Sequence, residues 1–178
     1  MGRWRIAVED WDAPDAAALR AAQRAELDAR YGSDDHEPGT APTAADVAVF
    51  LVARDERGTA IACGGLRPLA PGSAEVKRMY VRPEHRGSGV ATAVLRELER
   101  AAGDLGVTRL LLETGTAQPE AVRFYEREGY ERVENFGPYA GEPLSVCYAR
   151  DLAAPVPGRG GAAHRAAGGA DRETPLRS

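Results

Sequence analysis

The stretch Val81-Arg-Pro-Glu-His-Arg-Gly-Ser-Gly-Val-Ala91 decides how this 178-residue chain folds. It predicts a strand that runs into a glycine-rich turn, followed by a helix whose apolar stripe extends from Val90 to Leu105. Gly87 and Gly89 carry no side chain, so the turn can direct successive backbone N–H groups toward one point. The N-terminus of the helix adds partial positive charge at the same place. Together these features predict a site for a pyrophosphate.

Strand and helix signals alternate along the rest of the chain. Proline at the first helical position and glycine just beyond the last predict helices over residues 14–31 and 119–128. Residues 55–58 form a hairpin turn between two apolar runs. The predicted strands cover residues 4–9, 47–54, 59–68, 74–81, 109–114, 130–133 and 145–151. This order predicts a mixed, mostly antiparallel sheet of about six or seven strands with helices on both faces.

Composition limits the class of partner. The chain has 23 Lys plus Arg against 27 Asp plus Glu, and this net charge of −4 argues against nucleic acid or an anionic membrane surface. Cys63 and Cys147 lie in apolar runs without metal-ligand spacing, so we expect reduced core thiols and no metal. Without a signal peptide or a long apolar run, a cytoplasmic protein is expected. Residues 153–178, rich in Ala, Gly and Pro, are predicted to be a disordered tail after a domain of residues 1–152.

A second block, Gln118-Pro-Glu-Ala-Val-Arg-Phe-Tyr-Glu-Arg-Glu-Gly-Tyr130, follows downstream. The pattern Arg86-x-x-Gly89-x-Ala91 resembles the acyl-CoA-binding signature of the GNAT superfamily of N-acetyltransferases. The second block is similar to the superfamily's helix that carries Tyr followed by Gly and an aromatic residue. The element order over residues 3–152 also matches this acyl-CoA N-acyltransferase fold. As in similar bacterial sequences, the resemblance implies transfer of an acetyl group from acetyl-CoA to an amine in a ternary complex.

The resemblance also implies which residues bind the acetyl-CoA. Pantetheine would lie along the strand over residues 74–81, where a backbone amide would polarise the acetyl carbonyl. Many relatives have Asn where this chain has Gln118, and that Asn often contacts the cofactor. The cofactor-binding residues implied in this way are Met79, Tyr80, Val81, Arg86, Gly87, Ser88, Gly89, Val90, Ala91 and Gln118.

The resemblance implies that Tyr125 is the general acid that protonates the departing thiolate. A phenol suits this role because it keeps its proton at neutral pH. The alternative is an aromatic side chain that only packs its helix onto the sheet, as we expect for Phe124.

A base is needed as well, because an ammonium has no lone pair with which to attack. Glu75, on the strand expected to face the cofactor, is the first candidate, and Glu113, which closes the leucine-rich strand, is the second. Either could instead be a solvated carboxylate or an ion-pair partner of Lys77 or Arg78. We expect His85 to be a surface side chain rather than the base.

In this fold the acceptor would lie between residues 19–46 and 134–143. An acidic mouth there would favour a cationic amine, although charged loops are usually just solvated. Phe136 and Tyr139 would form a wall for a small-molecule amine acceptor. An exposed edge strand of the sheet can pair with the same edge of a second copy of the chain, which would form a homodimer. The acidic residues of the first segment are Glu26, Asp28, Asp34, Asp35, Glu37 and Asp46.

The sequence leaves two other functions to consider. A non-catalytic acyl-CoA-binding or regulatory domain of the same fold would have no use for Tyr125 and Glu75. A nucleotide-dependent oxidoreductase would use the glycines of residues 87–89, but its third glycine position is Thr92 here. The preceding strand also carries Glu75 and Lys77, where a buried parallel strand should be apolar.

Overall fold

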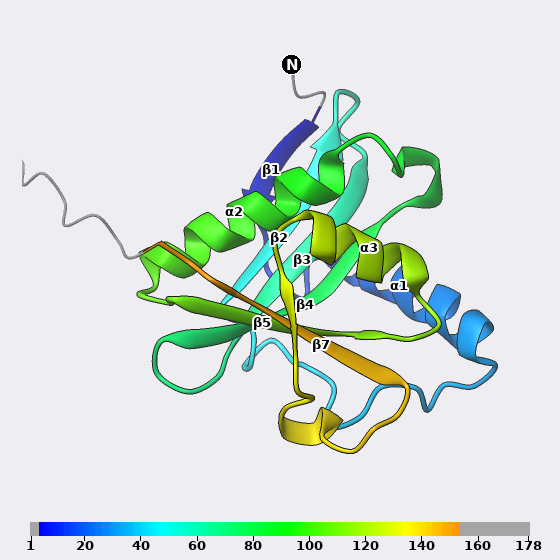
Figure 1. Ribbon diagram of the computed structural model, residues 1–178. Coiled ribbons are helices and arrows are strands. Elements are labelled where there is room, and N and C mark those ends of the chain that lie inside the picture. The colour runs from blue at the N-terminus through cyan, green and yellow to red at the C-terminus, as the bar shows by residue number, and fades with distance from the viewer. Residues whose placement is uncertain (1–3, 154–178) are drawn as a thin grey trace, which may run out of the picture.

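The computed structural model describes residues 4–153, which form one seven-stranded sheet in the order β1-β2-β3-β4-β5-β7-β6 (Figure 1). The strands are β1 Trp4–Val8, β2 Val49–Asp55, β3 Ala60–Pro68, β4 Ser73–Val81, β5 Arg109–Gly115, β6 Glu131–Val133 and β7 Ser145–Asp151. The α-helices are α1 Pro14–Tyr31, α2 Val90–Asp104 and α3 Pro119–Arg127. The predicted order of elements and the mixed, mostly antiparallel sheet are confirmed.

The expected C-terminal tail lies outside the described residues, apart from Ala153. Among residues 4–153, no helix combines the length and the apolar character needed to cross a membrane.

Local chemistry explains where several elements begin and end. Pro14 occupies the first turn of α1, and Gly32 ends this helix in the left-handed region with φ 71°. In the β2–β3 hairpin, the Asp55 side chain accepts backbone N–H bonds from Arg57 and Thr59, each at 2.9 Å. Gly58 supplies the positive φ of 82° that this turn requires. Such short-range signals place these boundaries without help from the core.

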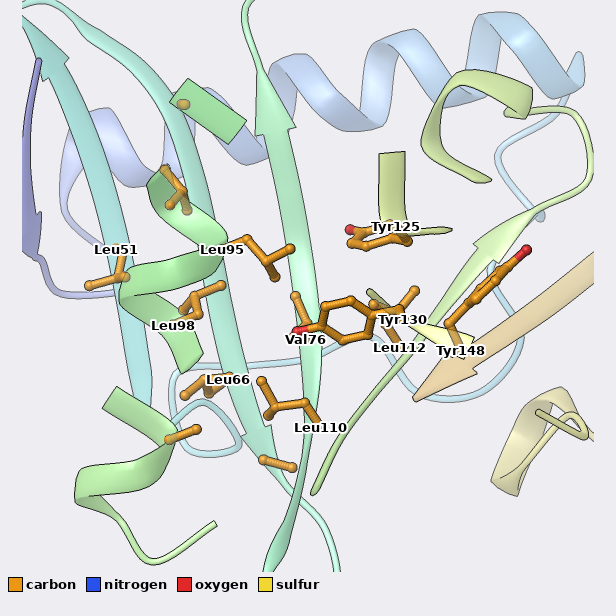
Figure 2. Packing of buried hydrophobic residues seen from close by; sticks show 14 of the residues in the cluster. Leu51, Leu66, Val76, Leu95, Leu98, Leu110, Leu112, Tyr125, Tyr130 and Tyr148 are labelled. Atoms are coloured by element: carbon orange, nitrogen blue, oxygen red, sulfur yellow. The ribbon is translucent and has the colours of Figure 1, made fainter. Parts of the chain in front are cut away.

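The helices cover both faces of the sheet, with α2 and α3 on one face and α1 on the other (Figure 1). The apolar stripe of α2 places Leu95 and Leu98 against the β-strand side chains Leu66 and Val76 (Figure 2). Gly64 lets the α2 face approach closely, because a Cβ there would lie 2.9 Å from Leu98 Cδ1. On the opposite face, the buried Leu19 of α1 packs in a smaller cluster that contains Phe50 and Tyr80. Burial of these apolar side chains on two faces holds the layers together.

The pairing of β4 with β5 shapes the functional region. These neighbours are the one parallel pair among the strands of the sheet, and they pair only from Ser73–Glu75 to Arg109–Leu111. Beyond these three residue pairs the strands do not hydrogen-bond to each other. The later parts of β4 and β5 therefore form two separate walls, and side chains from α1 and α3 meet between them.

A polar cluster around Glu128 joins α2 to α3. The Glu128 carboxylate accepts a bond of 2.9 Å from the Thr92 hydroxyl and pairs with Arg96 at 2.8 Å. Nearby, Glu99 on α2 accepts bonds from the Tyr130 hydroxyl at 3.0 Å and from Arg150 at 2.9 Å. Because Glu128 and Glu99 are largely buried, these charge-assisted bonds hold more firmly than surface pairs would.

Candidate active site

A cleft of about 510 Å³ lies between α1, β4, the glycine turn and α3. We call it the larger cleft. It is bordered by nine of the ten residues expected to contact a cofactor, and Ser88 is the exception. The Ser88 hydroxyl instead donates a 2.6 Å bond to the His85 carbonyl within the turn. His85, expected to be a surface side chain, also borders the larger cleft.

The glycine turn has the backbone geometry that a bound phosphate needs. Gly87 and Gly89 have φ of 75° and 91°, which only glycine adopts without strain. A Cβ at Gly87 would meet no atom within 4 Å, so the space beside it is open. The first backbone bond of α2 runs from the Ala93 N–H to the Gly89 carbonyl. The Arg86 and Val90 amides before it bond to the Pro83 carbonyl and the Ser88 hydroxyl, whereas those of residues 87–89 have no backbone acceptor within residues 4–153. The turn therefore fits the diphosphate of a CoA molecule.

Ion pairs cross the mouth of the larger cleft from α1. Arg86 pairs with Glu26 at 2.6 Å, and its Nε donates to the Val81 carbonyl at 3.0 Å. The bond to Glu26, the largest influence, raises the pKa of Arg86. Arg30 on α1 pairs in the same way with Glu120 on α3. Arg86 thus stands beside the cleft but already has an acidic partner.

A second cavity of about 110 Å³ adjoins the larger cleft and is called the smaller cavity. It lies among α1, the loop after it, the ends of β4 and β5, and Leu144. A Cβ at Gly115 would overlap the Tyr31 hydroxyl, so a larger residue here would have to displace the Tyr31 side chain. The residues that border both spaces are Gln23, Leu27, Met79, Gln118, Ala121 and Tyr125. The two spaces therefore share one junction, and the predicted general acid lies at it.

Tyr125 is buried, and its ring packs edge-on against Phe124 and Tyr130. Burial, and secondarily the charge of Glu113, raise the pKa of the Tyr125 phenol above its ordinary value. The phenol therefore keeps its proton throughout the physiological range. Tyr125 is part of the apolar core (Figure 2) and also borders both spaces, so its packing is compatible with the predicted role of general acid.

The two candidate bases occupy different places. Glu113 borders the smaller cavity, and burial raises the pKa of its carboxyl, although a 2.8 Å bond from the Ser145 hydroxyl opposes the shift. Glu75 was expected to face the cofactor, but it borders neither space. It is 3% exposed, accepts a 2.5 Å bond from the Tyr139 hydroxyl and lies 3.6 Å from Lys77. The geometry therefore favours Glu113 over Glu75.

The predicted acidic mouth and aromatic wall differ from what the structure contains. Glu26, Asp28 and Glu37 are each engaged by basic side chains, so they do not present free negative charge. Tyr139 turns inward to Glu75, and neither it nor Phe136 borders the smaller cavity. The aromatic wall is wrong because Tyr139 found a partner distant in sequence, which the pattern of aromatics does not reveal. Asp34, Asp35 and Asp46 have no basic partner within 4.0 Å among residues 4–153, so the acidic mouth is reduced to about half of its predicted residues.

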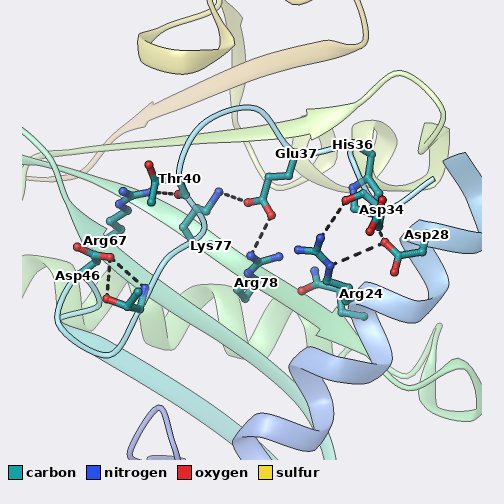
Figure 3. Close-up of polar contacts among 12 residues, drawn as sticks. Arg24, Asp28, Asp34, His36, Glu37, Thr40, Asp46, Arg67, Lys77 and Arg78 are labelled. Carbon is teal, nitrogen blue, oxygen red and sulfur yellow. Dashed lines mark hydrogen bonds and ion pairs between the residues drawn. The ribbon is translucent and has the colours of Figure 1, made fainter.

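Glu37 is central to a buried charge cluster at one wall of the smaller cavity. Its carboxylate accepts a 2.8 Å bond from Lys77 and pairs with Arg78 at 2.9 Å, as Figure 3 shows. Burial alone would raise the pKa of Glu37, but Lys77 and Arg78 outweigh it and the pKa is lowered. Lys77 also donates a 3.0 Å bond to the Tyr139 hydroxyl. The Glu37 carboxyl is therefore ionised at neutral pH.

Gln23 is a site residue that sequence reasoning missed. Its Nε2 donates a 2.9 Å bond to the Met79 carbonyl, which fixes the orientation of the amide. Its Oε1 is buried and is the one such side-chain atom in residues 4–153 without a hydrogen-bond partner. A buried acceptor without a donor costs about 1–3 kcal/mol, so a partner supplied by a ligand would explain it. On an amphipathic helix, no sequence signal separates this glutamine from a solvated one.

Comparison with known proteins agrees with this geometry. Residues 8–130 match the Acetyltransferase (GNAT) family. Over 104 residues the chain is 38% identical to an IAA acetyltransferase of Azospirillum brasilense, covering 58% of this chain and 67% of that protein. The chain therefore belongs to the GNAT acetyltransferase family.

Solved structures show the same fold. A Klebsiella pneumoniae protein assigned to the acyl-CoA N-acyltransferases superposes with a TM-score of 0.71 and 32% identity, over 84% of this chain and 97% of that one. A GNAT family acetyltransferase from Elizabethkingia anophelis, solved with acetyl-CoA bound, superposes with a TM-score of 0.63 and 16% identity. That match covers 85% of this chain and all of the other.

Proposed function

We propose that this protein transfers the acetyl group of acetyl-CoA to a primary amine of a small acceptor by direct attack in a ternary complex. The observation that carries the proposal is the junction at Tyr125, where a cleft that fits CoA meets a smaller polar cavity. The glycine turn would hold the diphosphate, and the thioester would reach the junction along β4. The Azospirillum relative is an IAA acetyltransferase by name, which supports acetyl as the transferred group.

In this mechanism each proton has a named donor and acceptor. Glu113 takes a proton from the acceptor's ammonium, and the freed nitrogen lone pair attacks the thioester carbon. The carbon–sulfur bond then breaks, and Tyr125 gives its phenolic proton to the thiolate sulfur. The second proton lost by the nitrogen restores Tyr125, while Glu113 releases its proton to solvent. A backbone amide of β4 would stabilise the oxyanion, a contact worth about 3 kcal/mol in other acyl transfers.

The first experiment is calorimetric titration of the protein with acetyl-CoA, with NADH as the control ligand. We expect micromolar binding of acetyl-CoA and none of NADH, followed by amine-dependent release of free thiol. Binding without thiol release for any amine would instead favour the non-catalytic acyl-CoA-binding domain. Failure to bind acetyl-CoA would remove the proposed function altogether.

A further inference from the structure

Two consecutive cations face the same wall of the smaller cavity. Successive strand residues normally point to opposite faces of a sheet. Here Lys77 and Arg78 both reach Glu37, because the β3–β4 register shifts between Cys63 and Gly65 and Arg78 adopts a φ of 58°. This bulge doubles the positive charge at one point of the wall.

Lys77 and Arg78 differ in how many of their N–H donors can still bind a ligand. Lys77 is surrounded by acceptors, with Glu37 at 2.8 Å, Tyr139 at 3.0 Å and Glu75 at 3.6 Å. Arg78 borders the cavity with a side chain only 11% exposed, and one of its terminal nitrogens pairs with Glu37. Within residues 4–153, no other carboxylate lies within 4.0 Å of it. A guanidinium has five N–H donors in a planar fork that matches a carboxylate, so Arg78 can bind a second one.

Another residue of the smaller cavity needs the reverse kind of group. Gln23 Oε1 is a buried acceptor without a donor within residues 4–153, and Gln23 and Tyr125 both border the junction with the larger cleft. The N–H of an acceptor amine would fill it where the acetyl group must arrive. A volume of about 110 Å³ is small beside the roughly 300–1,000 Å³ of drug-sized sites, so only a small acceptor fits.

We propose that the acceptor is a small amine that also carries a carboxylate, such as an amino acid or a close analogue. Its carboxylate binds Arg78 beside Glu37, and its amine lies between Gln23 Oε1 and Tyr125. This inference rests on the proposed acetyl transfer and adds the substrate class. A polyamine is disfavoured, because both oxygens of Glu37 are already paired with buried cations.

Equilibrium binding of product pairs tests the substrate class without relying on turnover. The protein is saturated with CoA and titrated calorimetrically with a panel of N-acetyl amino acids, each beside its neutral carboxamide. We expect at least one acid to bind 10-fold or more tightly than its amide. Arg78→Met should reduce this preference to within twofold, whereas the control Arg24→Met, on exposed α1 surface outside both spaces, should retain it. Equal binding of acids and amides by the natural protein would overturn the proposal.

Glu37→Gln supplies an independent variant with the opposite expected sign. Removing the carboxylate that shares Lys77 and Arg78 should tighten binding of the acid several-fold and leave the amide within twofold. Weaker binding of the acid by Glu37→Gln would contradict the proposal. If acetyl-CoA binds and simple amines release thiol as fast as amino acids do, the acetyltransferase remains and the carboxylate inference falls. If acetyl-CoA does not bind, the proposed function itself falls.

Discussion

The larger cleft and the smaller cavity are built on different principles. The cleft takes nine of its border residues from one segment, residues 79–91, and its central feature is a backbone turn. The smaller cavity collects side chains from α1, the following loop, β4, β5, α3 and Leu144. A backbone site depends on a few glycines, whereas a side-chain site depends on many distant contacts. The acceptor specificity of such a protein can therefore change while its cofactor binding stays the same.

Gly89→Glu should produce the largest effect, because it places a carboxylate in the larger cleft and also strains the backbone at the start of α2. A carboxylate placed against the expected diphosphate costs several kcal/mol, so we expect acetyl-CoA affinity to fall about 1,000-fold, or about 4 kcal/mol. Calorimetry measures the change. Gly89→Gln is the matched control, because it places a side chain of the same length on the same strained backbone, with φ 91°, but adds no charge. Unchanged affinity in Gly89→Glu would refute the diphosphate assignment.

Tyr125→Phe should separate chemistry from binding at the junction. Losing a general acid should lower kcat by about 100-fold, with the dissociation constant of acetyl-CoA within about threefold. Tyr148→Phe is the control, since it removes a buried tyrosine hydroxyl whose partner is Glu126, outside both spaces. A Tyr125→Phe variant with full turnover would leave Tyr125 only its packing role.

Glu113→Gln should lower kcat/KM at pH 8 by about 10- to 100-fold while stabilising the fold. Because burial raises the pKa of Glu113 in the folded protein, its ionised form is disfavoured there, and stability is lost as the pH rises through that pKa. The neutral amide avoids this loss, so the thermal midpoint at pH 8 should increase by about 2 °C. The natural protein should lose activity as the pH falls through the raised pKa, and the variant should lose this acid limb.

The matched control for Glu113→Gln is Glu131→Gln, an exposed carboxylate on β6. A normal rate in Glu113→Gln, together with a loss of rate in Glu75→Gln, would return the role of base to Glu75.

Ser145→Ala should give the smallest change and refine the assignment of the base. The Ser145 hydroxyl donates a 2.8 Å bond to Glu113, and this bond lowers the pKa of that carboxyl. Without it, the acid limb of the kcat/KM profile should move to higher pH. Ser73→Ala, whose hydroxyl bonds to the Ala70 carbonyl at the far end of β4, should leave the profile in place. If the acid limb of the Ser145→Ala profile does not move, Glu113 is not the group that titrates in that limb.

Most of the fold and half of the site could be predicted from the sequence. The helix predicted over residues 14–31 has those bounds, and the strand predicted over 47–54 runs from Val49 to Asp55. The glycine turn was also predictable, because turns and helix starts are encoded by neighbouring residues.

The side-chain cavity could not be predicted in the same way. The β4 bulge breaks the period-two alternation, so nothing in the sequence places Lys77 and Arg78 on one wall. The partner of Glu75 is Tyr139, 64 residues away, and that contact turns the first candidate base away from both spaces. Gln23 becomes visible only once its Oε1 is found buried without a donor.

Glu128 joins two walls of the larger cleft into one rigid unit, since α2 begins at the glycine turn and α3 carries Tyr125. The third wall, α1, is connected across the cleft by the Glu26–Arg86 and Arg30–Glu120 pairs, which are partly exposed. Exposed ion pairs exchange readily with water and contribute little energy. We therefore expect these two ion pairs to open when a molecule as long as acetyl-CoA enters, while the distance from the glycine turn to Tyr125 stays constant.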